Sequence, residues 1–179
     1  SFQMMAMSTA IIDSASAVTI SAGNLILGGQ SATNVNASSF QVSGGSALIQ
    51  GTSRLTMVNS AALGITNGSL VVSGDSTTTL QSSSFSVSGG GVEFNTRASF
   101  SLLSSSQGLV SGGSVSLVNQ AQLAIASSSL QVSGGSFNAR DASSVQLQPN
   151  ASVSVQGGSF VMQGTSTLVK IGRASCRER

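Results

Sequence analysis

Residues 111–135 read SGGSVSLVNQAQLAIASSSLQVSGG, and this stretch contains one full repeat of the pattern that decides the fold. It holds three pairs of apolar residues, and one residue separates the two members of each pair: Val115 and Leu117, Leu123 and Ile125, Leu130 and Val132. Side chains two residues apart point to the same face of a β-strand. The stretch therefore predicts three short strands joined by corners rich in Ser, Gly and Asn.

The same pattern recurs along the chain at the interval of a glycine ladder. The ladder glycines follow one another at 22 and 23 residues in alternation: Gly23, Gly45, Gly68, Gly90, Gly113, Gly135 and Gly158. Self-similarity at this period indicates stacked repeats, since a single coil cannot bury its own apolar side chains. We number the positions of each coil from its ladder glycine, which is position 0, and we call the residues at the same position in successive coils a column. Apolar residues fill the columns at +2, +4, +10 and +12, and those at five and three residues before the next glycine.

These six columns predict an all-β, three-sided parallel β-solenoid of about seven coils, with 22–23 residues per coil. A helical fold is excluded, because no 3.6-residue stripe is present and because Gly, Ser and β-branched residues are too frequent. The alternation of coil length places one extra residue in the corner before the third strand, where residues 58–62 run longer than residues 81–84.

Three further expectations concern the corners. The ladder glycine and its usual Gly or Asn predecessor permit a positive φ at a tight corner, and position +6 repeats this feature with Gly29, Gly51, Gly74 and Gly164, in alternation with Thr96, Asn119 and Asp141. The small residues at +8, mostly serine, either bond along the solenoid axis through their hydroxyls or merely save space. Asp75 and Arg97 share position +7 in adjacent coils and are expected to form an exposed ion pair.

The end of the chain differs from the rest. Residues 171–179 read IGRASCRER, which resembles a sequencing adapter translated in one frame, and Lys170 breaks the apolar column at +12. We therefore expect residues 1–169 to be one solenoid fragment, truncated at both ends, and residues 170–179 to be a non-native tail.

Charge and cysteine content exclude several classes of partner. The chain has 7 basic and 5 acidic residues, and removing Arg173, Arg177, Arg179 and Glu178 leaves 4 of each. The remaining net charge of zero argues against nucleic acid as a partner. The only cysteine, Cys176, lies in the tail, and no apolar run is long enough for a transmembrane segment.

In coil length and in the number of strands per coil, the chain resembles the right-handed parallel β-helix proteins. That family includes pectin-active enzymes and the stalks of bacterial surface adhesins and autotransporter passengers. The resemblance implies a right-handed coil over residues 1–169, and it rests on architecture rather than on a motif.

Enzymatic activity is not expected. Pectin-active relatives use clustered Asp, Lys and Arg side chains, whereas the native acids here lie at unrelated coil positions: Asp13, Asp75, Glu93 and Asp141. The chain has no histidine, and its only cysteine lies in the predicted tail, so transition-metal and Cys/His nucleophile sites are not expected either. No catalytic, cofactor or metal residue is predicted.

An ice-binding surface is the main alternative. It requires a flat, regular threonine array, and the second strand offers hydroxyls at +9 and +11: Thr56, Thr77, Thr79, Ser99 and Ser101. Arg54, Gln122, Ala124 and Gln146 interrupt the same columns.

The function expected from the sequence is that of a structural or adhesive stalk segment in a larger secreted or cell-surface protein. Ile26, Leu48 and Val71 share position +3 in consecutive coils and form the candidate contact patch. A glycan, a protein or another copy of the chain is the expected partner, and the expected location is extracellular.

Overall fold

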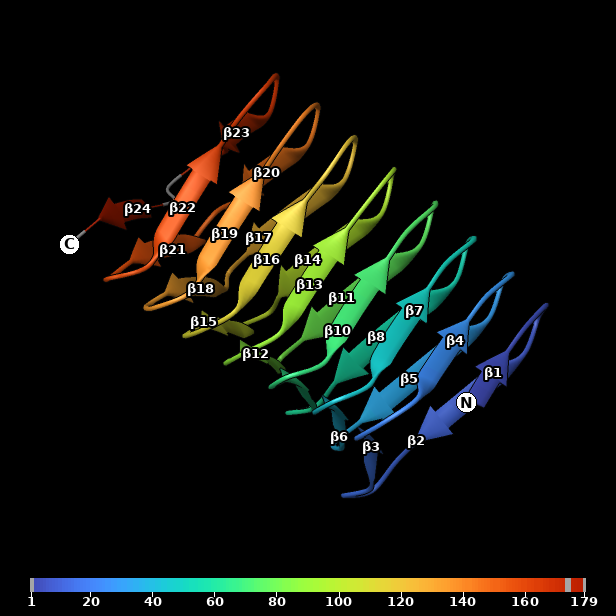
Figure 1. Cartoon of the computed structure of the whole chain (residues 1–179). Helices are drawn as coiled ribbons and strands as arrows, with labels where there is room; N and C mark the ends of the chain where they lie inside the picture. The colour runs from blue at the N-terminus through green and yellow to red at the C-terminus, as the bar shows by residue number, and fades with distance from the viewer. Residues whose placement is uncertain (1, 173–174, 179) are drawn as a thin grey trace.

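The computed structural model describes residues 2–172 and 175–178, and it consists of β-strands joined by short corners, with no helix among those residues (Figure 1). The strands form three parallel sheets of eight strands each, and every third strand along the chain belongs to the same sheet. The predicted fold class, a three-sided parallel β-solenoid of about seven turns, is confirmed.

Each coil contributes one strand to each sheet, in the order sheet 1, sheet 2, sheet 3. Sheet 1 contains β1 (Phe2–Met4), β4 (Asn24–Leu27), β7 (Ser46–Ile49), β10 (Ser69–Val72), β13 (Gly91–Phe94), β16 (Ser114–Leu117), β19 (Ser136–Ala139) and β22 (Ser159–Met162). Sheet 2 contains β2 (Thr9–Ile12), β5 (Ala32–Asn36), β8 (Arg54–Val58), β11 (Thr77–Gln81), β14 (Ser99–Leu103), β17 (Gln122–Ala126), β20 (Ser144–Leu147) and β23 (Thr167–Lys170). Sheet 3 contains β3 (Ala17–Ile20), β6 (Ser39–Val42), β9 (Ala62–Ile65), β12 (Ser84–Val87), β15 (Gln107–Val110), β18 (Ser129–Val132), β21 (Ser152–Val155) and β24 (Ser175–Glu178).

The strand register equals the column register read from the sequence. Leu70 pairs with Ala47 on one side and Val92 on the other, so position +2 of one coil stacks on +2 of the next. Along the middle coils, inward residues are buried and the residues between them are partly or fully exposed, except for Gly64, which is buried. The hydrophobic core therefore runs along the axis between the three sheets.

The predicted tail falls partly outside the described residues, because Arg173, Ala174 and Arg179 are not described. The backbone of β24 pairs in parallel with β21. The assignment of residues 170–179 as non-native stays a prediction.

The glycine ladder exists because neighbouring coils approach closely, and the positive φ that glycine permits is used in only part of the ladder. Only Gly23, Gly90 and Gly113 have a positive φ. At every coil junction from Gly23 to Gly158, however, the carbonyl oxygen of one ladder glycine accepts a hydrogen bond from the amide that follows the next ladder glycine, as when Gly45 accepts from Ser69 at 3.0 Å. A Cβ atom on Gly68 would lie 2.6 Å from that same oxygen, so no side chain fits.

The expectation of a positive φ at +6 is confirmed, and +6 is the consistently left-handed corner position. All eight residues there have a positive φ between 59° and 78°: Ala6, Gly29, Gly51, Gly74, Thr96, Asn119, Asp141 and Gly164. Glycine, asparagine and aspartate tolerate this conformation, which explains their frequency at +6.

The corner between sheets 2 and 3 explains why coil length alternates. Short corners contain one residue of positive φ, as at Ser82, whereas three of the long corners contain two in succession, as at Asn59 and Ser60. The long corner at Pro149 and Asn150 has a positive φ at Asn150 alone. The predicted position of the extra residue is confirmed, since β8 ends at Val58 and β9 begins at Ala62, but β11 ends at Gln81 and β12 begins at Ser84.

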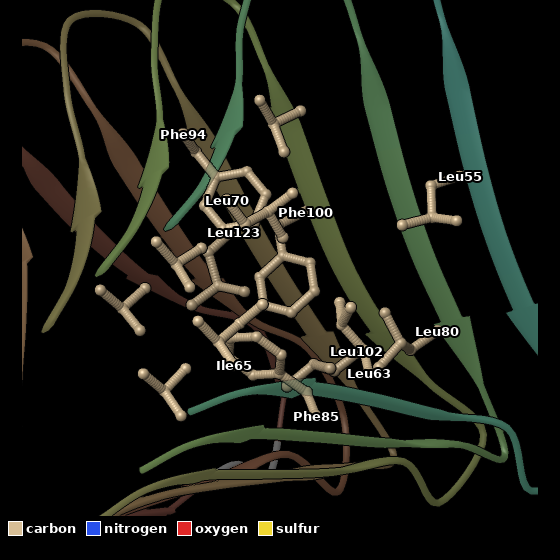
Figure 2. Close-up of a cluster of buried hydrophobic side chains, with 14 of the residues drawn as sticks. Leu55, Leu63, Ile65, Leu70, Leu80, Phe85, Phe94, Phe100, Leu102 and Leu123 are labelled. Carbon is tan, nitrogen blue, oxygen red and sulfur yellow. The ribbon is translucent and has the colours of Figure 1, made fainter. Parts of the chain in front are cut away.

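Phenylalanines from all three sides meet in the middle of the core (Figure 2). Phe100 stacks on Phe94 with ring centroids 4.7 Å apart, and it meets the ring of Phe85 edge to face at 5.0 Å. Gly108 follows Phe85 in its column, and a Cβ atom there would lie 2.8 Å from a methyl carbon of Leu130. The space in front of this inward glycine is therefore occupied by neighbouring side chains.

Replacing Phe100 by alanine is expected to lower the free energy of unfolding by about 3–5 kcal/mol, because the side chain is fully buried between two other rings. Urea unfolding followed by circular dichroism measures this change. Ser101→Ala, which alters an outward residue of the same strand, is the control and should change stability by less than about 0.5 kcal/mol. Equal effects of the two substitutions would contradict a close-packed core at Phe100.

Two glycine substitutions test whether glycine is required because the preceding coil lies too close for a side chain or because the backbone has a positive φ. Neither Gly68 nor Gly91 has a positive φ. Gly68→Ala is expected to destabilise by about 1–3 kcal/mol, because the new methyl group meets the Gly45 carbonyl. Gly91→Ala is the matched control, since its Cβ would meet nothing closer than 3.8 Å, and it should be neutral or stabilise by up to about 1 kcal/mol. Thermal unfolding measures both, and a harmless Gly68→Ala would refute the steric explanation.

Candidate functional surface

The candidate contact patch lies on the outer face of sheet 1. Ile26, Leu48 and Val71 come from the adjacent strands β4, β7 and β10, and the strand register places them directly side by side. Each of the three side chains is partly buried. We call these three residues the aliphatic stripe. The structure therefore brings the three predicted residues together, and whether they bind a partner is a separate proposal.

The aliphatic stripe ends at a shallow groove. In the same column, Glu93 of β13 follows Val71, and Ser116 of β16 follows Glu93. Since Gly91 carries no side chain, the surface is hollowed there to a volume of about 190 Å³, lined in part by Val71 and Glu93. The Glu93 carboxylate accepts a hydrogen bond of 2.9 Å from the Asn95 side chain. An apolar surface thus lies next to a carboxylate and several hydroxyl groups.

The hydroxyl-bearing residues of the ice-binding alternative lie together on the outer face of sheet 2. Thr56, Thr79 and Ser101 stack in one column, and Thr77 and Ser99 stack in the column beside it. Arg54 precedes Thr77 in its column, and Gln122 follows Ser99. The five hydroxyl-bearing residues form a patch three strands wide rather than a face-long array.

The predicted ion pair between Asp75 and Arg97 is confirmed. Arg97 donates from Nε to Asp75 Oδ1 at 2.5 Å and from Nη2 to Oδ2 at 2.8 Å, across adjacent coils. Both side chains are exposed, 49% for Asp75 and 62% for Arg97, so the pair fixes the alignment of the corner more than it stabilises the fold.

The other carboxylates of residues 1–169 are each used locally. Asp13 accepts hydrogen bonds from the Ser14 amide and the Asn36 side chain, and Asp141 accepts one from the Asn119 amide. Within residues 2–172 and 175–178, no three His, Cys, Asp or Glu side chains are placed to hold a metal ion. That part of the chain also contains no helix long and apolar enough to cross a membrane.

The expected axial bonding of serine hydroxyls occurs at +8 and also at a second corner. At +8, Ser31 donates to the Ser53 hydroxyl at 3.2 Å. The Ser53 hydroxyl donates to the Leu27 carbonyl of the preceding coil at 3.3 Å and, at 2.6 Å, to the Gln50 carbonyl of its own corner. In the corner between sheets 2 and 3, backbone amides instead donate to serine hydroxyls of the next coil: Ser16 to Ser38, Ser83 to Ser106, and Ser106 to Ser128.

Side-chain amides form a second set of coil-to-coil contacts that sequence reasoning missed. Asn59 donates to Asn36 at 2.7 Å, and Asn36 donates to Asp13 at 2.7 Å. In the corner between sheets 1 and 2, Asn119 donates to Asn95 at 2.5 Å. Recurrence of asparagine one coil apart was the available signal, and these residues serve to hold coils together.

Comparison with protein-family models, with curated proteins and with solved structures found no match to this chain.

The ion pair predicts a pH dependence with a definite sign. Hydrogen bonding to Arg97 lowers the pKa of Asp75 below its ordinary value. Because the pKa is lower in the folded state, the pair favours folding above the unfolded-state pKa, and this contribution is lost as the pH falls through the folded-state pKa. Arg97→Gln is therefore expected to raise the pKa of Asp75 toward its ordinary value, as measured by an NMR titration of the carboxyl carbon. Arg140→Gln is the control, and an unchanged Asp75 pKa in Arg97→Gln would contradict the pairing.

Proposed function

We propose that the chain is a structural or adhesive stalk segment of a larger secreted or cell-surface protein, and that it is not an enzyme. The observation that carries this proposal is the contrast between the two sides of each strand. The inward columns form a largely apolar core, and the outer faces consist mainly of Ser, Thr, Gln and Asn. Such a repeat can be lengthened one coil at a time, because each coil contacts only its neighbours.

The use of the native carboxylates supports a role without catalysis. Asp13, Glu93 and Asp141 each accept hydrogen bonds from neighbouring corner or strand groups, and Asp75 is paired with Arg97. Acid–base hydrolysis of a polysaccharide requires two carboxyl groups facing one substrate bond. Asp13, Asp75 and Asp141 instead join neighbouring coils, and Glu93 accepts its hydrogen bond within its own coil.

The aliphatic stripe is the proposed adhesive contact. It is the place on sheet 1 where three aliphatic side chains adjoin one another on an otherwise largely polar outer face, and a groove with a carboxylate lies at its end. An apolar face of a sugar ring or an aliphatic protein side chain fits this combination, with the hydroxyl groups and Glu93 available for hydrogen bonds.

Ice binding is the second candidate, and the flat hydroxyl patch around Thr79 favours it. Thermal hysteresis of the purified chain would support this candidate. Loss of the hysteresis in Thr79→Lys, with retention in Ser116→Lys on sheet 1, would place the activity on sheet 2.

Adhesion is tested by exposing beads that carry the chain to arrays of glycans and extracellular proteins. We expect binding to at least one surface, and we expect Leu48→Lys to weaken it roughly tenfold or more, because a charge replaces the centre of the apolar contact. Asn138→Lys is the matched control, since Asn138 lies in the same outward column beyond Ser116 and does not line the groove. Cleavage of any polysaccharide by the chain, or equal effects of the two substitutions, would overturn the proposal.

A further inference from the structure

The corner between sheets 3 and 1 carries the chain's single asparagine–glycine sequence, at Asn67 and Gly68. The pair lies between β9 and β10, and Asn67 is exposed. The same column holds Gly44 in the preceding coil and Gly89 in the next. Since neither glycine has a side chain, nothing at these two positions stacks on Asn67. Its Oδ1 atom lies against the Gly89 backbone, 3.2 Å from where a Cβ atom would be.

Two groups of this pair lack hydrogen bonds. In the part of the chain that the structure describes, neither the Asn67 side chain nor the backbone amide of Gly68 makes a hydrogen bond. Gly68 also has no Cβ, so nothing on that residue hinders the approach of its nitrogen to Cγ of Asn67. A side-chain amide carbon and the following backbone nitrogen are therefore held by no partner.

The other asparagines differ in this respect, and Asn59 is the clearest comparison because it is also exposed and also lies in a corner. Its side chain donates to Asn36 at 2.7 Å, and the next amide, that of Ser60, donates to the Ser82 carbonyl at 2.7 Å. Both hydrogen bonds have to break before the two groups can react with each other. Each remaining asparagine has a hydrogen-bonded side chain, or is followed by an amide that is hydrogen-bonded or within a strand: Asn24, Asn34, Asn36, Asn95, Asn119, Asn138 and Asn150.

We propose that Asn67 is a site of spontaneous conversion to aspartate and isoaspartate in the folded chain, and that isoaspartate loosens the coil junction at Gly68. The Gly68 amide gives its proton to water or hydroxide, and its nitrogen forms a bond to Cγ of Asn67. The bond from Cγ to Nδ2 breaks, and Nδ2 takes up a proton and leaves as ammonia. A succinimide ring remains.

Water then opens the succinimide at one of its two carbonyl carbons. Addition at Cγ breaks the new bond and gives aspartate. Addition at the main-chain carbonyl carbon breaks the original peptide bond and gives isoaspartate, in which the main chain runs through Cβ and Cγ. Water is the co-reactant, ammonia is the product, and no group is oxidised or reduced. The reaction does not depend on the adhesive role proposed above.

Isoaspartate does not fit the spacing of the coils. It lengthens the main chain before Gly68 by one C–C bond, about 1.5 Å. The Ser69 amide, which follows directly, donates to the Gly45 carbonyl at 3.0 Å, and a Cβ atom on Gly68 would already lie 2.6 Å from that oxygen. The added atom therefore displaces the start of β10 from β7, and β10 carries Val71 of the aliphatic stripe.

Peptide mapping by mass spectrometry of the 179-residue chain, incubated in mildly alkaline buffer, tests the reaction. Electron-transfer fragmentation distinguishes isoaspartate from aspartate. We expect Asn67 to convert roughly tenfold or more faster than Asn59, because two hydrogen bonds restrain Asn59. The rate at Asn67 should rise with pH, since the attacking nitrogen has to lose its proton. Asn67→Gly gives this corner the Gly-Gly sequence of the neighbouring coils and should abolish the conversion without unfolding the chain.

The same map in urea separates the effect of the fold from that of the sequence. Unfolding should accelerate conversion at Asn59 and should change the rate at Asn67 by less than roughly tenfold. Protection of Asn67 in the folded chain by more than that factor would overturn the proposal, because the corner would then hold the pair apart.

The effect on the junction is measured on the isoaspartate fraction after chromatographic separation. Freshly purified Asn67→Asp is the matched control, since it introduces the same charge without the longer main chain. We expect the isoaspartate fraction to have a lower melting temperature than both Asn67→Asp and the wild type. Equal melting temperatures of the isoaspartate fraction and Asn67→Asp would refute the loosening of the junction.

Discussion

Hydrogen bonds between the backbones of neighbouring coils set the spacing of this solenoid, and the rest of the structure has to fit that spacing. Parallel strands lie about 4.8 Å apart, so each residue has the same position of the next coil directly beside it. The ladder carbonyls illustrate the consequence. Gly45 accepts a hydrogen bond from Ser69, and that bond places its oxygen where a side chain on Gly68 would be. A glycine recurs in every coil because the hydrogen bond recurs in every coil.

The same spacing forces neighbouring columns to share the core volume. Phe85, Phe94 and Phe100 fill the middle coils from three sides. In the next coil, Gly108 follows Phe85 in its column, and the side chains of Leu130 and Leu102 occupy the space in front of it. Neighbouring columns thus adjust to each other in the size of their side chains rather than in their polarity. The hydroxyls of Thr33 and Thr78 are buried without a hydrogen-bond partner, at a cost of about 1–3 kcal/mol each, in positions where the shape of a β-branched residue fits.

The fold could be predicted almost entirely from the sequence, because a solenoid repeats one local pattern and register follows from the period. The six columns, the longer corner at Asn59 and the pairing of Asp75 with Arg97 all needed only coil positions. The reason for the ladder glycines could not be predicted in this way, since it depends on the direction of a carbonyl in the preceding coil. The serine contacts in the corner between sheets 2 and 3 were not predicted for a related reason. There the donor is a backbone amide, as when Ser83 donates to the Ser106 hydroxyl and Ser106 to the Ser128 hydroxyl, and every residue type except proline has such an amide.

A candidate surface is harder to predict than the core because stacking constrains inward and outward positions differently. An inward residue has to fit its column, so its identity reports the fold. An outward residue meets few such constraints, and a background of Ser, Gln and Asn suffices to keep the faces in water. Information about function therefore lies in departures from that background, and Leu48 between Ile26 and Val71 is such a departure on sheet 1. The sequence could place these three residues side by side, but the groove beside Val71 depends on the missing side chain of Gly91 and emerged only from the structure.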